Sequence, residues 1–158
     1  MKFFTLLLLS IFCSFAFSQK QKIDVDDDII TVDGVPYAKI EKVGKPAENF
    51  ILKSLDGKDL IYMQYVRWTH PSKINNANKD GSDYYLVLTF VNDKQVCEIK
   101  PFMTKKGIAK ALVEYDLIKD STVIQENEDK MVLLNGTKYS QERAGLTGSG
   151  TTIIINNR

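Results

Sequence analysis

The sequence has few of the residues from which enzyme active sites are commonly built. It contains two cysteines, at positions 13 and 97, and a single histidine, His70. A zinc site needs about four ligands, and one histidine with one distant cysteine does not supply them. The sequence also has no nucleophile elbow of the G-x-S-x-G type and no glycine-rich phosphate loop. No motif therefore indicates a reaction.

The scarcity of cysteine also bears on how the fold is held together. Cys97 lies within Gln95–Ile99, a run typical of a strand. We expect its side chain to face a core as a small apolar residue. A reactive thiol is the alternative, with Lys94 and Lys100 near it in sequence. Because Cys13 belongs to a segment that we expect to be removed, no internal disulfide is expected.

Long apolar runs are absent apart from one at the N-terminus. It spans Phe3–Phe17, follows Lys2 and ends at Ala16-Phe17-Ser18. A helix of this length rises about 22 Å, short of the roughly 30 Å hydrocarbon core, which argues against a transmembrane anchor. The pattern predicts a signal peptide over residues 1–18, cleaved near Ser18-Gln19, and export to the periplasm or the extracellular space. Cys13 follows two large residues, which disfavours a lipoprotein cleavage site.

An excess of charge of one sign is absent as well. Removal of the leader takes away only Lys2, and equal numbers of basic and acidic residues remain. A neutral chain has no field to attract nucleic acid, so a nucleic-acid partner is not expected. We expect one domain over residues 19–143 and a tail over 144–158. The tail combines a flexible glycine-rich linker with the β-branched run Thr151–Ile155, which either docks as a strand or stays unpaired.

The chain is rich in alternating apolar residues separated by turn signals. This pattern predicts about six strands between residues 23 and 100, with Asp33-Gly34 suited to a tight hairpin. Thr104 is expected to cap a helix whose apolar stripe runs from Ile108 to Ile118. Residues 127–135 are open to two interpretations, a second helix or a strand. The predicted fold class is α+β, with a hairpin-built antiparallel sheet followed by one or two C-terminal helices.

The strand predicted over residues 59–69 carries large side chains on both faces. We expect either a central strand covered on both sides or one with an outer binding face. The candidate ligand-binding residues are Tyr65, Arg67 and Tyr85, which would form a stacking platform for a sugar or a peptide. The polar segment His70–Asp83 would form its rim. Packing of these aromatic residues in the core is the alternative.

A calcium site is the one metal hypothesis that the sequence suggests. Asn76, Asn78 and Asp80 occupy the first, third and fifth places of an EF-hand-like loop, and Gly81 is at the sixth. The twelfth place is Val87 instead of the bidentate glutamate. Turns are also rich in asparagine, aspartate and glycine, so an ordinary turn is the alternative. No cofactor other than calcium is expected.

The layout resembles small exported proteins of Bacteroidota, especially those of flavobacteria. The resemblance is carried by Ser18-Gln19-Lys20 and by residues 32–39, 50–60 and 131–136, and it covers most of the chain after the leader. It implies a location in a Gram-negative envelope. That group brings no established activity, so no functional residues are carried over.

These observations favour a non-enzymatic binding or interaction module of the cell envelope. Its partner would be an envelope protein, a peptide or a glycan. One alternative is a small hydrolase, which would need two carboxylates in one cleft with strongly shifted pKa values. Another is a structural or assembly protein in which Ile153–Ile155 pairs with the sheet edge of a partner.

Overall fold

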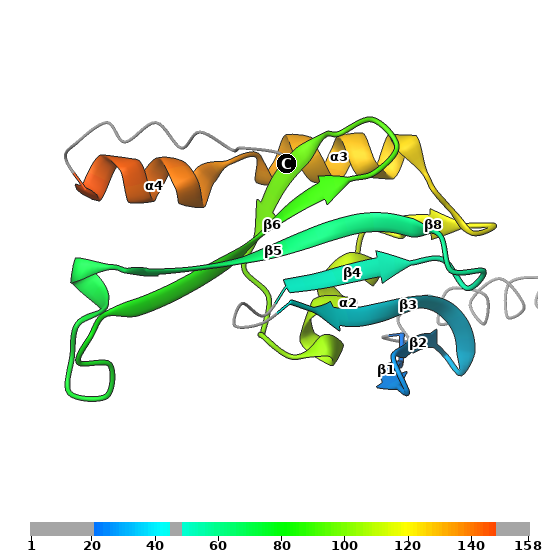
Figure 1. Ribbon diagram of the computed structural model, residues 1–158, viewed down its shortest axis with the longest axis horizontal. Coiled ribbons are helices and arrows are strands. Elements are labelled where there is room, and N and C mark those ends of the chain that lie inside the picture. The colour runs from blue at the N-terminus through cyan, green and yellow to red at the C-terminus, as the bar shows by residue number, and fades with distance from the viewer. Residues whose placement is uncertain (1–20, 45–48, 148–158) are drawn as a thin grey trace, which may run out of the picture.

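A meander of seven antiparallel strands forms the body of the protein. The computed structural model describes residues 21–44 and 49–147. Strands that follow one another in sequence are neighbours in the sheet (Figure 1). The strands are β1 (Ile23–Asp26), β2 (Ile29–Val32), β3 (Val35–Val43), β4 (Asn49–Lys53), β5 (Asp59–Thr69), β6 (Ser82–Phe90) and β7 (Val96–Ile99). The expected α+β fold with a hairpin-built antiparallel sheet is confirmed.

The tight turns follow from residues that tolerate a positive φ. Asp33 and Gly34 have φ values of 52° and 83°, as the mirror-image turn of a two-residue hairpin requires. A second, separate hairpin joins β8 (Ile118–Lys119) to β9 (Thr122–Val123) through Asp120 and Ser121, both with positive φ.

Helices follow the sheet in sequence. They are α2 (Lys105–Val113), α3 (Gln125–Asn135) and α4 (Lys138–Thr147). The hydroxyl of Thr104 caps α2 by accepting a hydrogen bond from the backbone N–H of Gly107 at 3.0 Å. The helix is shorter than its predicted stripe, because Ile118 belongs to β8. The helical interpretation of residues 127–135 is confirmed, and Gly136 ends α3 with a φ of 50°.

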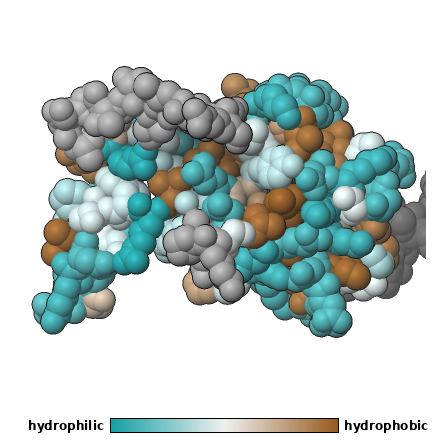
Figure 2. Space-filling view, in the orientation of Figure 1, coloured by the Kyte–Doolittle hydropathy of each residue, from teal (hydrophilic) through white to brown (hydrophobic). Residues whose placement is uncertain are grey.

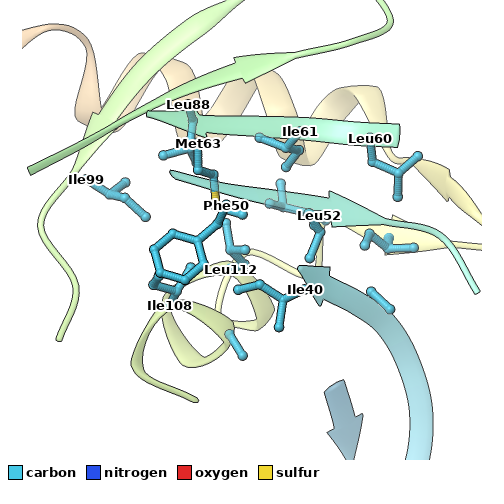
Figure 3. Close-up of a cluster of buried hydrophobic side chains, with 14 of the residues drawn as sticks. Ile40, Phe50, Leu52, Leu60, Ile61, Met63, Leu88, Ile99, Ile108 and Leu112 are labelled. Carbon is cyan, nitrogen blue, oxygen red and sulfur yellow. The ribbon is translucent and has the colours of Figure 1, made fainter. Parts of the chain in front are cut away.

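The hydrophobic core lies between α2 and one face of the sheet, which we call the inner face (Figure 3). Ile61 and Met63 of β5 and Leu88 of β6 project from this face and are buried. Ile108 and Leu112 of α2 pack against them. Met131 of α3 joins the same cluster. The alternation of each strand thus places one row of side chains in the core and the next row on the opposite, outer face.

The long strands β5 and β6 project beyond the rest of the sheet (Figure 1). Pairing of β4 with β5 extends only to Met63, and pairing of β6 with β7 reaches only Leu86. Beyond these points β5 and β6 pair with each other as far as Thr69 and Ser82. We call residues 64–86, with their connecting loop, the arm.

Helix α4 runs alongside the arm (Figure 1). It extends to Thr147, so the boundary predicted at residue 143 falls inside a helix. Residues 1–20, which contain the predicted leader, and the run Thr151–Ile155 lie outside the described residues. Within the described part of the chain, no helix has the length and apolar character that crossing a membrane requires.

Candidate functional site

The inner face of the arm continues past the core and carries aromatic and charged side chains. Tyr65 and Arg67 of β5 and Tyr84 of β6 share this face, because Tyr65 pairs with Leu86 and Arg67 with Tyr84. The rings of Tyr65 and Tyr84 stack with their centroids 6.2 Å apart. Both tyrosines are half-buried, and Arg67 is exposed. We call Tyr65, Arg67 and Tyr84, with Thr69, the open face.

Arg67 is held in position on the open face. Its guanidinium forms an ion pair with Asp80 at 2.8 Å, and its Nε donates to the hydroxyl of Ser82 at 3.0 Å. Hydrogen bonds from Ser82 and the charge of Arg67 lower the pKa of Asp80. The side chain of Arg67 is nevertheless 60% exposed. It therefore presents a positioned cation to solvent beside the two tyrosine rings.

The sequence-based placement of Tyr85 on the same face as Tyr65 is wrong. Tyr85 pairs with Val66, so it projects from the opposite face of the arm. Tyr85 is only 1% exposed because α4 covers it. The rings of Tyr85 and Tyr139 stack with their centroids 5.6 Å apart. Tyr85 thus packs between the arm and α4. Tyr84 occupies the position beside Tyr65 and Arg67 that was predicted for Tyr85.

A buried glutamate attaches α4 to the sheet. Glu98 of β7 is 1% exposed. Its Oε2 accepts hydrogen bonds from the backbone N–H groups of Tyr139 and Ser140 at 2.8 and 2.9 Å, and its Oε1 accepts one from the Ser140 hydroxyl. These are the second and third residues of α4, where the side chain of a capping residue usually binds. The negative carboxylate also lies at the positive end of the helix dipole.

A hydroxyl chain extends this attachment to the arm. The single proton of the Ser140 hydroxyl is donated to Glu98, so the hydroxyl of Tyr85 donates to Ser140 Oγ at 3.1 Å.

The α4 side of the arm, which we call the braced face, also carries Asp83. Burial alone would raise the pKa of Asp83, but the hydrogen bonds from Lys100 and the backbone of Tyr84, together with the nearby lysine charges, outweigh burial and lower the pKa. The buried polar groups of the braced face, the Asp83 carboxylate and the Tyr85 hydroxyl, are therefore hydrogen-bonded.

His70 fastens the middle of α4 to the tip of the arm. Its residue is only 7% exposed, and its ring lies 4.9 Å from that of Trp68. Nε2 donates to Glu142 of α4 at 3.0 Å. Nδ1 accepts from the backbone N–H of Ser72 at 3.2 Å and so caps the short 3-10 helix η2 (Pro71–Lys73). This acceptor role fixes the ring tautomer with the proton on Nε2.

The hydroxyl of Ser72 also lies 3.0 Å from Nδ1 of His70, which makes a serine–histidine–glutamate chain. Such a chain can activate a hydroxyl for attack on an acyl group. Stabilisation of the resulting oxyanion requires free donors aimed at it. Here the N–H of Ser72 bonds to His70, and the N–H groups of Lys73 and Ile74 bond to backbone carbonyls. The arrangement accordingly works as a clamp between the arm tip and α4.

The calcium candidates lie in the loop at the tip of the arm. The side-chain oxygen of Asn78 accepts from the N–H of Ser82 at 3.0 Å, and Asp80 is bonded to Arg67 and Ser82. Asn76 is exposed. Among the described residues, no group of three or more His, Cys, Asp or Glu side chains is arranged to hold a metal ion. The oxygens of Asn78 and Asp80 thus serve the loop and the orientation of Arg67.

A second polar cluster joins α3 to the turn between β6 and β7. Glu128 of α3 is fully buried, and its Oε2 accepts from Asn92 at 2.8 Å. Its Oε1 has no hydrogen-bond partner among the residues that the structure describes. Burial raises the pKa of Glu128 to about 7, and the nearby carboxylate of Asp93 adds to the rise. Hydrogen bonds from Gln95 and Gln125 lower the pKa of Asp93.

Glu128 and Asp93 have pKa values shifted in opposite directions, as a carboxylate-dependent hydrolase would require of its two carboxyl groups. However, Glu128 has no exposed surface, and a catalytic acid must contact its substrate. The two carboxyl groups therefore affect the stability of the fold.

Cys97 lies nearby and is also buried, and burial raises the pKa of its thiol to about 12. The expectation of a core-facing Cys97 is confirmed.

Sequence reasoning missed Tyr84, Glu98 and Glu142. The partnership of Tyr84 with Arg67 depends on strand register, and the roles of Glu98 and Glu142 depend on a helix that was not predicted. One signal was present, since Glu98 is a charged residue inside an otherwise apolar strand.

Comparisons with protein-family models, with curated proteins and with solved structures found no match.

Proposed function

We propose that this chain is a non-enzymatic interaction module whose binding surface is the open face of the arm. The observation that carries the proposal is the bracing of the opposite face. A two-stranded ribbon is marginally stable in water by itself. Glu98 and His70 attach α4 along the back of this ribbon, at its base and at its tip. The result is a rigid arm that keeps Tyr65, Arg67 and Tyr84 accessible.

The residue types on the open face favour a protein partner. Tyrosine and arginine are enriched among the residues that contribute most to protein–protein affinity. Arg67 is already oriented by Asp80 and Ser82, so little rotamer freedom remains to be lost on binding. The visible surface of the arm is mostly hydrophilic or intermediate in hydropathy (Figure 2). A polar, aromatic surface of this kind suits a partner that binds and dissociates.

We further propose that the module acts in the cell envelope after export. Support comes from the leader-like residues 1–18 and from the balanced charge of the remaining chain. The partner would then be another envelope protein.

Alanine substitution on the two faces of β5 and β6 tests the binding surface. Arg67→Ala and Tyr84→Ala should each weaken retention of the partner by about tenfold or more, because each removes a contact at the centre of the open face. The measurement is recovery of the partner by the tagged protein from an envelope extract of cells that produce it. The matched control is Tyr62→Ala, which removes a 44% exposed tyrosine from the outer face. Equal losses for Tyr62→Ala and Tyr84→Ala would contradict the assignment.

A further inference from the structure

Strand β1 forms one edge of the sheet, and β2 is the one strand that pairs with it among the described residues. The N–H of Asp33 donates to the C=O of Lys22. In an antiparallel ladder such bonded pairs recur at every second position, so the even-numbered residues of β1 bond to β2. The odd-numbered residues Ile23 and Val25 therefore direct their N–H and C=O groups away from the sheet.

The outward N–H of Val25 is bonded to a local side chain. It donates to the carboxylate of Asp24 at 2.9 Å. The same carboxylate accepts a hydrogen bond from Lys106 of α2 at 3.1 Å. The side chains of Asp24 and Lys106 are each about half exposed, and exposed ion pairs contribute little to stability. An incoming backbone carbonyl can therefore replace the Asp24 carboxylate at the N–H of Val25.

A cavity borders this edge. Strand β1 lies beside α2 (Figure 1), and a cavity of about 420 Å³ lies between them. Gln21 and Ile23 line it on the side of the strand, and Lys110 and Glu114 line it on the side of the helix. We call these four residues the β1 groove. Its volume is within the range of about 300–1,000 Å³ that is typical of ligand sites.

The two charged side chains of the β1 groove are available to a ligand. Lys110 and Glu114 are exposed and lie one turn apart on α2, so they occupy the same face of the helix. Neither of them forms an ion pair with another residue in the described part of the chain, whereas Lys106, one turn earlier, is paired with Asp24. The groove thus combines an outward strand edge at Ile23 with one unpaired charge of each sign.

We propose that the β1 groove binds an extended peptide segment of another protein, which pairs with β1 as an additional strand. In this mode of recognition, main-chain hydrogen bonds supply affinity and side-chain contacts supply specificity. The edge of a second copy of this chain is flanked by its own α2, so it cannot enter the groove without displacing that helix. The groove consists of β1 and α2 alone, so this proposal does not depend on the open face of the arm.

The charges of the groove define the peptide. Lys110 favours an acidic side chain, and Glu114 favours a basic one. One helical turn separates the two groups by about 5.4 Å along α2, and two residues of an extended chain span about 6.6 Å. Residues two apart in a strand also project from the same face. The peptide should therefore carry an acidic and a basic residue two positions apart.

A random heptapeptide library displayed on phage, selected against the purified protein, tests the proposal. Enriched peptides should carry the predicted pair of charges. A synthetic copy of an enriched peptide should slow the exchange of the Ile23 N–H at least about tenfold, because that N–H becomes paired in a strand. Lys110→Glu should weaken binding about tenfold or more, whereas the control Lys119→Glu, at an exposed lysine outside the groove, should not. The double variant Lys110→Glu with Glu114→Lys should prefer a peptide with its two charges exchanged.

Three results would overturn the proposal. The first is a selection that enriches no peptide. The second is equal binding of the enriched peptide by the wild type and by Lys110→Glu; if Arg67→Ala abolishes that binding, the peptide occupies the open face and only the groove is excluded. The third is slow exchange of the Ile23 N–H without peptide, lost on dilution together with a dimer in size-exclusion chromatography, because a second copy would then fill the edge.

Discussion

Replacing Glu98 with alanine should release α4 from the sheet and destabilise the protein by about 3 kcal/mol. The substitution removes the acceptor of three hydrogen bonds from Tyr139 and Ser140. Each buried donor left without a partner costs about 1–3 kcal/mol, which outweighs any gain from removing the carboxylate. Urea unfolding measures the loss, and hydrogen exchange over residues 138–147 shows whether the helix has detached.

Two further variants separate capping from general destabilisation. Glu98→Gln keeps one acceptor oxygen at the helix terminus and should cost about half as much as Glu98→Ala. Glu142→Ala removes a carboxylate in the middle of α4 whose side chain is 46% exposed, and it should cost less than about 1 kcal/mol. Equal destabilisation by Glu98→Ala and Glu142→Ala would show that Glu98 does not anchor the helix.

The protein should lose stability as the pH rises from 5 to 8, and Glu128 should be the cause. Its pKa is about 7 in the folded protein and 4.5 in the reference state. The folded state therefore keeps a proton that the unfolded chain releases, and the free energy of unfolding falls with pH across this window. The total loss is about 3 kcal/mol, or roughly 10 °C in Tm. The lowered pKa of Asp93 acts only below pH 3.8, outside this range.

Glu128→Gln isolates the contribution of this one carboxyl group. Glutamine is neutral, and its side-chain oxygen can still accept from Asn92. The variant should therefore be more stable than the wild type at pH 8 and nearly equal to it at pH 5. Thermal unfolding at both pH values provides the comparison. Glu126→Gln changes an exposed carboxyl on the same helix and should leave the pH dependence of the wild type in place.

Local rules predicted the sheet well because its strands are signalled locally. Alternation located the strands, and Asp33-Gly34 has the backbone conformation that its turn requires. The helix α4 was missed because Lys138–Thr147 lacks a clear apolar stripe. Its stability comes from Glu98, forty residues earlier in the chain, and from His70. Interactions over such separations leave no pattern in a local window of sequence.

The binding face was predicted in part. Alternation along β5 correctly grouped Tyr65 with Arg67, because that relation lies within one strand. Assigning the tyrosine of β6 required the register between two strands joined by a long loop. That register places Tyr84 opposite Arg67 and turns Tyr85 toward α4. A shift of one residue reverses every side chain of a strand, so the tyrosine could not be chosen from sequence.

The proposed function requires that partners bind the open face of the braced arm. Site-specific photo-crosslinking tests it most directly, with p-benzoylphenylalanine placed at Thr69 or at Gln64 in cells that produce the protein. Both residues are exposed and lie on β5, but they project from opposite faces. We expect a discrete crosslinked partner from position 69 and none from position 64. Crosslinking from position 64 alone, or the same products from both positions, would contradict it.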